Sequence, residues 1–409
     1  MTLAHRRVAV TGLGAIAALG HDAPSLWQAL ISGECGIRPI ANIAGDRLTT
    51  RTVAEVQGFD PAVHFDARRL PMLDRTSQFA LVAAREAIAH AAPDGIDGIG
   101  VDPRKAGVVF GAGLGMHTLD SAYQALYGDG LSRLHPFTVP RIMPNAPASH
   151  ISIDFGMRGP SFATATACAS STHAIGLAFH MIRAGLLDLA ITGGSDASLT
   201  FGHLRAWDAL RVLSPDTCRP FSKDRTGLVL GEGAAVLVLE EWERASARGA
   251  MIHAEIVGFG MSADAGDITA PDEAGAAQAI DAALDDAGLN PTGVQYVNAH
   301  GTGTRLNDRS ETAALKRVFG DHSRLLAMSS TKSMLGHCLN AGGALEALAT
   351  ILSLREGIAP PTVGYRVPDP ECDLDCVPNT ARRLAIDVAL SNSFAFGGFN
   401  AVLALRQTR

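Results

Sequence analysis

The run Thr164-Ala-Thr-Ala-Cys-Ala-Ser-Ser-Thr172 lies where a strand-like segment ends and an amphipathic helix begins, so Cys168 stands beside a helix N-terminus. Exposed amides and the helix dipole favour negative charge at such a position. A cysteine placed there has a pKa lowered from about 8.5 to a range of roughly 3.5 to 7.5. The sequence therefore predicts that Cys168 is a nucleophile with a depressed pKa.

Strand-like apolar runs and helical patterns alternate on both sides of this cysteine. Strands are expected at 7–14, 106–111, 187–193, 234–239, 252–258, 294–299 and 388–391. Helices are expected at 23–33, 77–90, 173–184, 274–287, 309–319 and 341–355. This alternation favours an α/β fold whose sheets are covered by helices on both faces.

A weak internal repeat indicates duplication. Residues 174–185 can be laid on residues 346–357 at a constant offset of 172, and each segment follows a turn of small residues. We therefore expect two similar halves, 1–255 and 256–409, each with a strand-to-helix turn facing one shared crevice.

Composition and charge limit the class of protein. Of the 409 residues, 47% are hydrophobic and 18% are charged, which is typical of a soluble enzyme. The formal net charge of −7 argues against a nucleic-acid-binding body. Two arginine pairs are nevertheless candidates for docking an acidic partner, because interface charge acts locally. They are Arg68 with Arg69, and Arg205 with Arg211.

The cysteine pattern favours a reducing compartment. The six cysteines include no Cys-x-x-Cys pair and no regular framework. The first residues lack an apolar signal core, and no uncharged apolar stretch reaches 18 residues. We expect a cytoplasmic protein without a membrane span.

Two further clusters carry residues suited to chemistry. In Asn298-Ala-His-Gly-Thr-Gly-Thr304 a strand pattern stops at His300, and Ser329-Ser-Thr-Lys-Ser-Met-Leu-Gly-His-Cys338 brings Lys332 and His337 onto another turn. A histidine exchanges protons near neutral pH, or donates its N–H to a developing oxyanion. We expect these residues and Cys168 to share one site.

At these motifs the sequence resembles the elongating β-ketoacyl-[acyl carrier protein] synthases of the synthase II type, which are condensing enzymes of the thiolase-like superfamily. Further shared motifs are Val10-Thr-Gly-Leu-Gly14, Gly159 to Ser171, Arg219-Pro-Phe-Ser-Lys-Asp-Arg225, Gly231-Glu-Gly233 and Asn392-Ser-Phe-Ala-Phe-Gly-Gly398. The runs Ala206-Trp-Asp-Ala-Leu-Arg and Pro215-Asp-Thr-Cys-Arg-Pro-Phe are similar to the nodulation protein E subgroup. The resemblance implies a duplicated, five-layered α/β/α/β/α thiolase-like fold.

The resemblance also implies a reaction. Cys168 would accept an acyl chain from acyl carrier protein, and malonyl-carrier protein would then lose CO₂. His300 and His337 would stabilise the enolate, whose attack on the acyl group gives β-ketoacyl-carrier protein, in fatty acid or specialised polyketide or polyene elongation. Substrates would arrive on the carrier's phosphopantetheine, without a tightly bound cofactor.

Supporting roles follow from the same resemblance. Lys332 would keep positive potential at the site, with Glu311 as its carboxylate partner. Phe396 would gate the second substrate, and its backbone N–H with that of Cys168 would hold the oxyanion. The residues expected to bind the phosphopantetheine arm are Thr302 and Thr304.

The expected acyl pocket departs from the usual pattern. Leu114 and Trp207 match positions that line the acyl tunnel, while Met116 stands where the family often has glycine. Ala395 and Phe399 replace residues of the usual Phe-Gly-Phe-Gly-Gly-Thr-Asn ending. We therefore hypothesise an acyl preference that differs from that of a housekeeping synthase.

No metal cluster is evident in the sequence. An oxygen-lined pocket for a monovalent cation, as in some relatives, is a weaker expectation with a structural role. Its residues would be Asn298, Glu346, Ser391 and Asn392.

Several assemblies and functions stay open. The resemblance implies a homodimer, and the alternative is the catalytic or chain-length subunit of a heterodimeric type II polyketide ketosynthase. Retention of Cys168 weighs against a chain-length subunit. A thiolase or thioester hydrolase would need other partners, and neither Cys338 nor Cys376 falls in a convincing thiolase position.

Overall fold

The computed structural model describes residues 6–41, 43 and 47–408, and ten strands of this part of the chain join in one sheet. The order is β10-β9-β13-β14-β8-β1-β7-β6-β4-β5. One half of the sheet contains β1 (Val8–Ala17), β7 (Gly233–Glu241), β6 (Leu189–Asp196), β4 (Ala106–Ala112) and β5 (Ser161–Thr164). The other contains β8 (Ala254–Ala263), β14 (Phe399–Arg406), β13 (Val388–Ala395), β9 (Tyr296–Asn298) and β10 (Ala327–Ser329).

The two halves repeat one topology. In each, the first strand pairs antiparallel with the last strand, which pairs antiparallel with a third strand, and two parallel ladders follow. A short antiparallel ladder between β1 and β8 joins them, with Val8 opposite Ile256. The expected boundary after residue 255 falls inside β8, which begins at Ala254.

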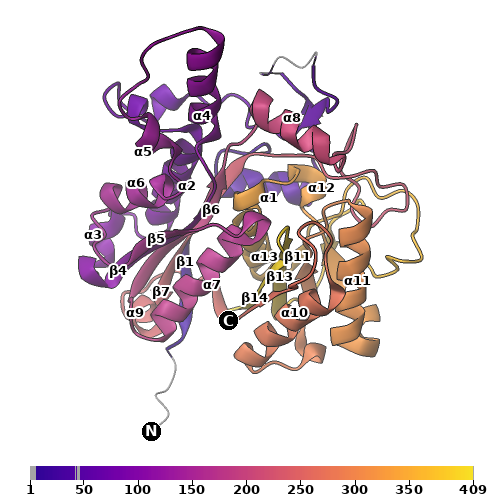
Figure 1. Cartoon of the computed structure of the whole chain (residues 1–409). Coiled ribbons are helices and arrows are strands. Elements are labelled where there is room, and N and C mark those ends of the chain that lie inside the picture. Colours follow the sequence, from indigo (N-terminus) through magenta and orange to yellow (C-terminus); the bar gives the residue numbers. More distant parts are fainter. Residues whose placement is uncertain (1–5, 42, 44–46, 409) are drawn as a thin grey trace.

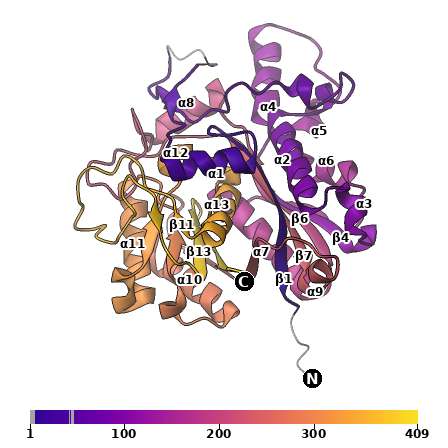
Figure 2. The same ribbon diagram turned by 180° about the vertical axis from the view of Figure 1, so that it is seen from behind.

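Helices form three layers around the two half-sheets (Figures 1 and 2). On one flank, α2 (Arg75–Ala91) packs on β1 and β7, and α6 (Ala146–Asp154) packs on β4. On the other flank, α10 (Glu273–Ala287) packs on β8 and β14 and against α11 (Arg305–Phe319). Between the half-sheets lie α7 (Ser170–Arg183) and α13 (Gly342–Glu356), which contact each other. The five-layered thiolase-like arrangement expected from the sequence is confirmed.

The central helices are equivalent by position. They begin 172 residues apart, at Ser170 and Gly342, which is the offset of the internal repeat. A helix between two sheets is apolar on all sides, and α13 is buried from Gly342 to Leu354. The crossing of α7 and α13 is close, because a Cβ on Gly343 would lie 2.0 Å from Thr172 Oγ1.

The structure adds elements that the sequence patterns did not predict, including β5, β10 and β14. The remaining helices are α1 (Ala23–Ser32), α3 (Gly95–Ile99), α4 (Met116–Tyr123), α5 (Thr138–Ile142), α8 (Phe201–Leu210), α9 (Trp242–Ala247) and α12 (Lys332–Leu335). The short strands are β2 (Arg38–Pro39), β3 (Thr52–Val53), β11 (Ile358–Ala359) and β12 (Arg382–Arg383). None of the helices in the described ranges has the length and hydropathy needed to cross a bilayer.

Candidate active site

Cys168 lies in a tight turn between β5 and α7. The turn spans Ala167–Ala169, and Ala167 adopts a left-handed backbone conformation with φ of +50°. The side chain of Cys168 is buried, with 8% of the residue exposed. Backbone N–H groups of Phe396 and of Cys168 itself point to the sulfur. Cys168 therefore lies at the start of the central helix, which is the position that the sequence predicts.

His300 lies two residues after the end of β9 at Asn298 and begins a glycine loop. Gly301 and Gly303 have φ of +35° and +76°, values that favour glycine. The buried carboxylate of Glu311 on α11 accepts the backbone N–H of His300 at 2.9 Å and that of Gly301 at 2.8 Å. Glu311 thus fixes the loop that carries His300.

Lys332 connects His300 to the central helix. Its ammonium donates to His300 Nδ1 at 3.2 Å and to the His300 carbonyl at 2.6 Å. It also forms a buried ion pair with Glu346 on α13. The expected pairing of Lys332 with Glu311 is wrong, because Glu311 is occupied by the backbone of the His300 loop and Glu346 reaches the ammonium instead.

The two histidines are held in the same tautomer. An ammonium can only donate, so His300 Nδ1 is an acceptor. The backbone N–H of Leu339 donates to His337 Nδ1 at 3.3 Å, so this nitrogen is an acceptor as well. The proton of each neutral imidazole is therefore on Nε2.

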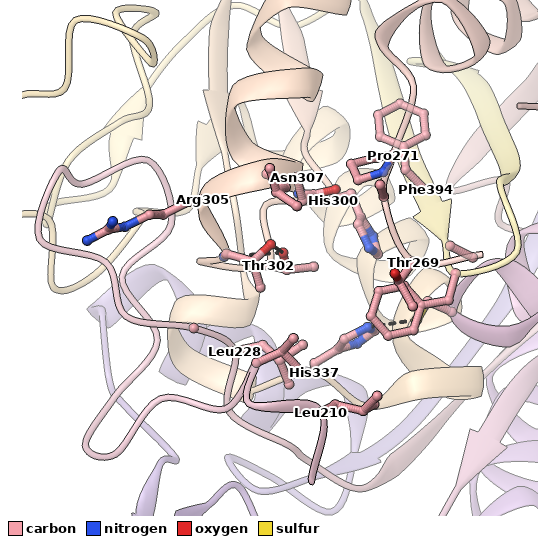
Figure 3. A pocket seen from close by; sticks show the side chains of 18 of the residues that line it. Leu210, Leu228, Thr269, Pro271, His300, Thr302, Arg305, Asn307, His337 and Phe394 are labelled. Atoms are coloured by element: carbon pink, nitrogen blue, oxygen red, sulfur yellow. Dashed lines mark hydrogen bonds between the residues drawn. The ribbon is translucent and has the colours of Figure 1, made fainter. Parts of the chain in front are cut away.

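One ring nitrogen of each histidine and Cys168 Sγ all lie within 4.8 Å of one another. His337 Nε2 lies 2.9 Å from Cys168 Sγ. The His300 and His337 rings are perpendicular, with centroids 5.5 Å apart (Figure 3). The site therefore presents two fixed hydrogen-bond donors next to one thiol.

Burial controls the protonation of these groups. It raises the pKa of the Cys168 thiol to about 11, against the lowering effects of Lys332 and of the two backbone N–H groups. Burial, followed by the charge of Lys332, holds the pKa of His300 and His337 well below 6.5. The depressed cysteine pKa expected from the helix N-terminus is wrong, since desolvation of the thiolate outweighs the nearby dipoles.

The three side chains do not suit a resident metal ion, although their ligand atoms all lie within 4.8 Å of one another. A metal would bind Nε2 of each neutral histidine and require the proton on Nδ1. Lys332 and Leu339 donate to those Nδ1 atoms, so the surrounding hydrogen bonds oppose this tautomer.

A cavity of about 510 Å³ opens from Cys168, His300 and His337 toward the surface. Its further lining includes Thr302, Thr304, Trp207, Leu210, Val212, Leu228, Ile268 and Phe396. Phe396 stacks on Trp207, with ring centroids 6.0 Å apart at an angle of 21°. In Figure 3, Leu210 and Leu228 lie beside His337, while the Arg305 guanidinium points away from both histidines. Leucine side chains thus form the cavity wall beside His337, and Cys168 lines the same cavity.

Comparisons with known proteins agree with this site. Residues 5–245 match the model of the β-ketoacyl synthase N-terminal domain, and residues 253–366 match that of the C-terminal domain. The chain belongs to the β-ketoacyl synthase family. Nodulation protein E of Rhizobium sp. (strain N33) is 48% identical over 406 residues, which cover 98% of this chain and 99% of the relative.

Other relatives of this β-ketoacyl synthase also match over almost the full length of both chains. The 3-oxoacyl-[acyl-carrier-protein] synthase 2 of Staphylococcus aureus (strain N315) is 43% identical over 411 residues, covering 98% of this chain and 99% of the relative. The solved structure of the ishigamide ketosynthase/chain length factor superposes with a TM-score of 0.93 at 36% identity. That match covers 99% of this chain and 100% of the other. The synthase II type and the thiolase-like fold are therefore confirmed.

The structure divides the expected pocket residues of the synthase into two groups. Thr302, Thr304, Trp207 and Phe396 line the cavity with Cys168. Leu114, Met116 and Phe399 are not among its lining residues. Leu114 is 44% exposed and Phe399 is 40% exposed. Their expected contact with the acyl chain therefore has no support from the fold of the single chain.

The four candidate docking arginines of the synthase lie in different surroundings. Arg68 is exposed, and Arg69 forms an ion pair with Asp154 of α6. Arg205 is exposed on α8 and pairs with Asp208 at 3.6 Å. Arg211, at the end of α8, is exposed and lines the cavity. Arg211 is therefore the best placed of the four to meet a molecule that enters the cavity.

Some contributing groups of the synthase carry no local sequence signal. Glu346 is the carboxylate partner of Lys332, yet its sequence context is that of an ordinary helix residue. The Leu339 backbone N–H fixes the His337 tautomer. Every residue except proline has such a group, so the type of residue at position 339 does not predict this hydrogen bond. The loop from Ile268 to Pro271 lines the cavity, and it joins elements far from the catalytic motifs in sequence.

Proposed function

We propose that this synthase catalyses a decarboxylative Claisen condensation between an acyl chain on Cys168 and malonyl-acyl carrier protein, giving β-ketoacyl-acyl carrier protein. One observation carries the proposal: the Nε2–H groups of His300 and His337 are fixed as donors beside a buried thiol. A site with two neutral donors next to a nucleophile suits a reaction in which oxyanions form twice.

In the first half-reaction, the Cys168 thiolate attacks the thioester carbon of acyl-carrier protein. The negative charge that develops on the thioester oxygen is held by the backbone N–H groups of Phe396 and Cys168, which already point into this space. The intermediate collapses as the bond between its carbon and the carrier sulfur breaks, and the acyl chain stays on Sγ. The departing sulfur takes up the proton that the Cys168 thiol lost when it became a thiolate, so the carrier leaves as a thiol.

In the second half-reaction, the thioester oxygen of malonyl-carrier protein accepts hydrogen bonds from His300 and His337. The bond to the malonyl carboxylate breaks, CO₂ leaves, and the enolate charge meets donors that need no reorientation. The enolate carbon attacks the acyl carbon on Cys168, and the sulfur leaves as thiolate. Lys332 keeps His300 Nδ1 hydrogen-bonded throughout.

The walls of the cavity fit a carrier-borne substrate. Thr302 Oγ1 and Thr304 Oγ1 lie 2.9 Å apart on the wall that leads from the surface to His300, where they offer hydrogen bonds to the amides of a phosphopantetheine arm. Phe396 precedes Gly397 and Gly398, whose φ values of +86° and +71° suit a hinge. We propose that Phe396 leaves Trp207 to admit the malonyl group, and that Arg211 meets the acidic carrier.

Mass spectrometry of the synthase with acyl- and malonyl-carrier proteins tests the reaction. An acyl adduct on Cys168, its transfer to malonyl-carrier protein and the release of CO₂ are expected. A Cys168→Gln variant should keep or raise malonyl decarboxylation while condensation is abolished. An adduct that is only hydrolysed, or a folded Cys168→Gln variant without decarboxylation, would contradict the proposal.

We also propose that the synthase pairs with a second copy along β5. This strand is the last in the sheet order, and its Phe162 is 38% exposed. Exposed apolar side chains cluster nearby in sequence, at Tyr123, Tyr127, Leu131, Leu134, Phe137, Val139 and Met143. An open edge beside apolar surface favours pairing, and light scattering should give twice the chain mass.

A heterodimer is the second candidate assembly. The ishigamide ketosynthase, which shares the fold, was solved with a chain length factor. In such a pair this chain would be the catalytic subunit, since Cys168, His300 and His337 are all present and in contact. Activity of the purified chain alone would favour the homodimer, and activity only with a second gene product would favour the heterodimer.

A monovalent cation is proposed beside the catalytic lysine. Each residue of the expected cation set has a buried side-chain oxygen without a hydrogen-bond partner among the described residues: Asn298 Oδ1, Glu346 Oε2, Ser391 Oγ and Asn392 Oδ1. Ser391 and Asn298 are opposite each other on paired strands, so a hard cation fits this oxygen set. The ion would hold β9, β13 and α13 together. A melting temperature that is higher in potassium than in choline salts, and equal in both for Ser391→Ala, is the expected result.

We place the synthase in the cytoplasm. All six cysteines are free, and five of them are buried. Free thiols persist in a reducing compartment. Fractionation of the native host should recover the protein with cytoplasmic markers.

A further inference from the structure

Asn340 joins the two turns that carry Cys168 and His337. It lies in the short 3-10 helix Leu339–Ala341. Its Nδ2 donates to Asp196 Oδ2 at 2.6 Å, and its Oδ1 accepts from Ser170 Oγ at 2.9 Å. One amide thereby links the end of β6, the start of α7 and the segment after His337.

Ser170 is the residue that closes the nucleophile turn. Its Oγ accepts the backbone N–H of Thr166 at 2.9 Å, and its one hydroxyl hydrogen is shared between the Ala167 carbonyl at 2.6 Å and Asn340 Oδ1 at 2.9 Å. A non-glycine residue in the left-handed region costs about 1–3 kcal/mol and persists only where its surroundings enforce it. At Ala167, with φ of +50°, the hydrogen bonds of Ser170 supply that enforcement.

The turn that follows His337 is strained in the same way. Leu339 has φ of +45°, and this conformation turns its backbone N–H toward His337 Nδ1. Asn340 is the next residue and the one bonded to Ser170. The two strained turns are therefore tied directly to each other through an Asn340–Ser170 hydrogen bond.

The other end of the amide is anchored in the core. Asp196 is 1% exposed, its Oδ1 accepts the Ser198 backbone N–H at 3.0 Å, and burial raises its pKa. Two titratable groups interact with Asp196, His203 and the Cys338 thiol. The ring nitrogens of His203 are engaged with the Ser198 carbonyl and Trp207 Nε1. The Asn340 amide thus satisfies the remaining oxygen of Asp196.

A glycine makes room for this junction. A Cβ on Gly113 would lie 2.6 Å from Asn340 Nδ2, so the loop after β4 rests directly on the amide. The contact holds the amide from a third side. Its orientation is therefore fixed by Asp196, Ser170 and Gly113 together.

We infer that Asn340 is a positioning residue that sets the 2.9 Å contact between Cys168 Sγ and His337 Nε2 through Ser170, with Asp196 as its anchor. Loss of the amide frees the two turns to move relative to each other. A displacement of about 1 Å at such a site lowers a rate by up to about 100-fold. Of the two measurements that test this inference, only the acylation of Cys168 by acyl-carrier protein rests on the proposed function.

The test compares Asn340→Ala, Ser170→Ala and the double variant. One readout is the rate at which iodoacetamide alkylates Cys168 in the folded protein, which needs no substrate, and the other is acylation by acyl-carrier protein. Each single variant should be slower by about tenfold or more in both. The double variant should be no slower than the slower single variant, since both remove the same link. Ser323→Ala is the matched control, because Ser323 Oγ also donates to the carbonyl three residues before it, at 2.7 Å from Gly320 O.

Exchanging the side chains of Asn340 and Asp196 distinguishes a positioning role of Asn340 from a general loss of stability. Asn340→Asp alone places two carboxylates face to face and should be slow. Combined with Asp196→Asn it restores one donor and one acceptor, and should recover most of the alkylation rate. Single-variant rates within twofold of the parent, multiplicative effects in the double variant, or an exchanged pair no faster than Asn340→Asp would each overturn the inference. Because alkylation uses no substrate, this result stands even if condensation is not observed.

Discussion

His337 Nε2 lies 2.9 Å from Cys168 Sγ although 169 residues separate them in the chain. Each residue lies in the segment that leads into a central helix: Cys168 is two residues before the start of α7, and His337 is five residues before the start of α13. The repeated topology of the two halves therefore has a second consequence besides a large core. It brings two strand-to-helix turns together, one with the nucleophile and one with a donor that meets it.

The pH dependence of Cys168 distinguishes a buried thiol from an activated one. Because the pKa of Cys168 is raised to about 11, the thiolate fraction grows tenfold per pH unit below that value. The rate of alkylation by iodoacetamide should therefore rise about tenfold for each pH unit between pH 6 and pH 9. Peptide mass spectrometry of Cys168 measures this, with Cys168→Ala as the blank. A plateau by pH 8 would instead indicate the depressed pKa that the helix N-terminus alone predicts.

Removal of either histidine should separate the two half-reactions. His300→Ala and His337→Ala each delete one Nε2–H donor to the enolate, and loss of such a donor lowers a rate by about 10²–10³-fold. Decarboxylation of malonyl-carrier protein should fall by this amount, and acylation of Cys168 should fall less, especially in His300→Ala. Equal losses of both activities in a folded His300→Ala variant would contradict the assigned roles.

Lys332→Met should affect both stability and catalysis. It leaves the buried Glu346 carboxylate without its cation, which costs about 3–5 kcal/mol in unfolding free energy. It also removes the donor to His300 Nδ1, so decarboxylation should fall at least about tenfold.

A second substitution separates these two effects of Lys332. Adding Glu346→Gln to Lys332→Met removes the unpaired charge and should restore much of the stability, measured by denaturant unfolding. Decarboxylation should stay low, because His300 Nδ1 still lacks its donor. Recovery of both properties together would argue that Lys332 acts only on folding.

Chain-length preference should depend on Trp207. Its indole lines the cavity and stacks on Phe396, so Trp207→Ala enlarges the space and should shift acceptance toward longer or bulkier acyl-carrier proteins. Leu114→Ala should leave the profile unchanged, because Leu114 is exposed and does not line the cavity. Competition between acyl-carrier proteins of graded length measures both. A changed profile for Leu114→Ala would place that residue at the acyl chain after all.

Local patterns predicted the elements that carry the site. The helix expected at 341–355 is α13, from Gly342 to Glu356, and the strand expected at 106–111 is β4, from Ala106 to Ala112. Apolar runs between glycine turns are strong signals for buried strands and helices. β14 was not predicted, although it pairs along its whole length with β13 and connects that strand to β8.

Electrostatic properties of the site were predicted less well. The N-terminus of α7 is a favourable place for a thiolate, yet the pKa of Cys168 is raised because the side chain is buried. The degree of burial depends on segments far away in sequence, such as the loop that carries Phe396. The pairing of Lys332 with Glu346 rather than Glu311 has the same origin, because the packing of α11 and α13 brings Glu346 to the ammonium and Glu311 to the backbone of the His300 loop.

Residue type, periodicity and motif were enough to predict the class of fold, and to select Cys168 as the candidate nucleophile together with the residues that accompany it. The three-dimensional packing was needed to show which Nδ1 atoms accept hydrogen bonds, which carboxylate neutralises Lys332 and which pocket residues face Cys168. Those properties depend on distances of a few ångströms between chain segments. The packing of α7 against α13 between the two half-sheets sets these distances. This packing depends on segments from both halves of the chain, so it cannot be predicted from any one segment of the sequence.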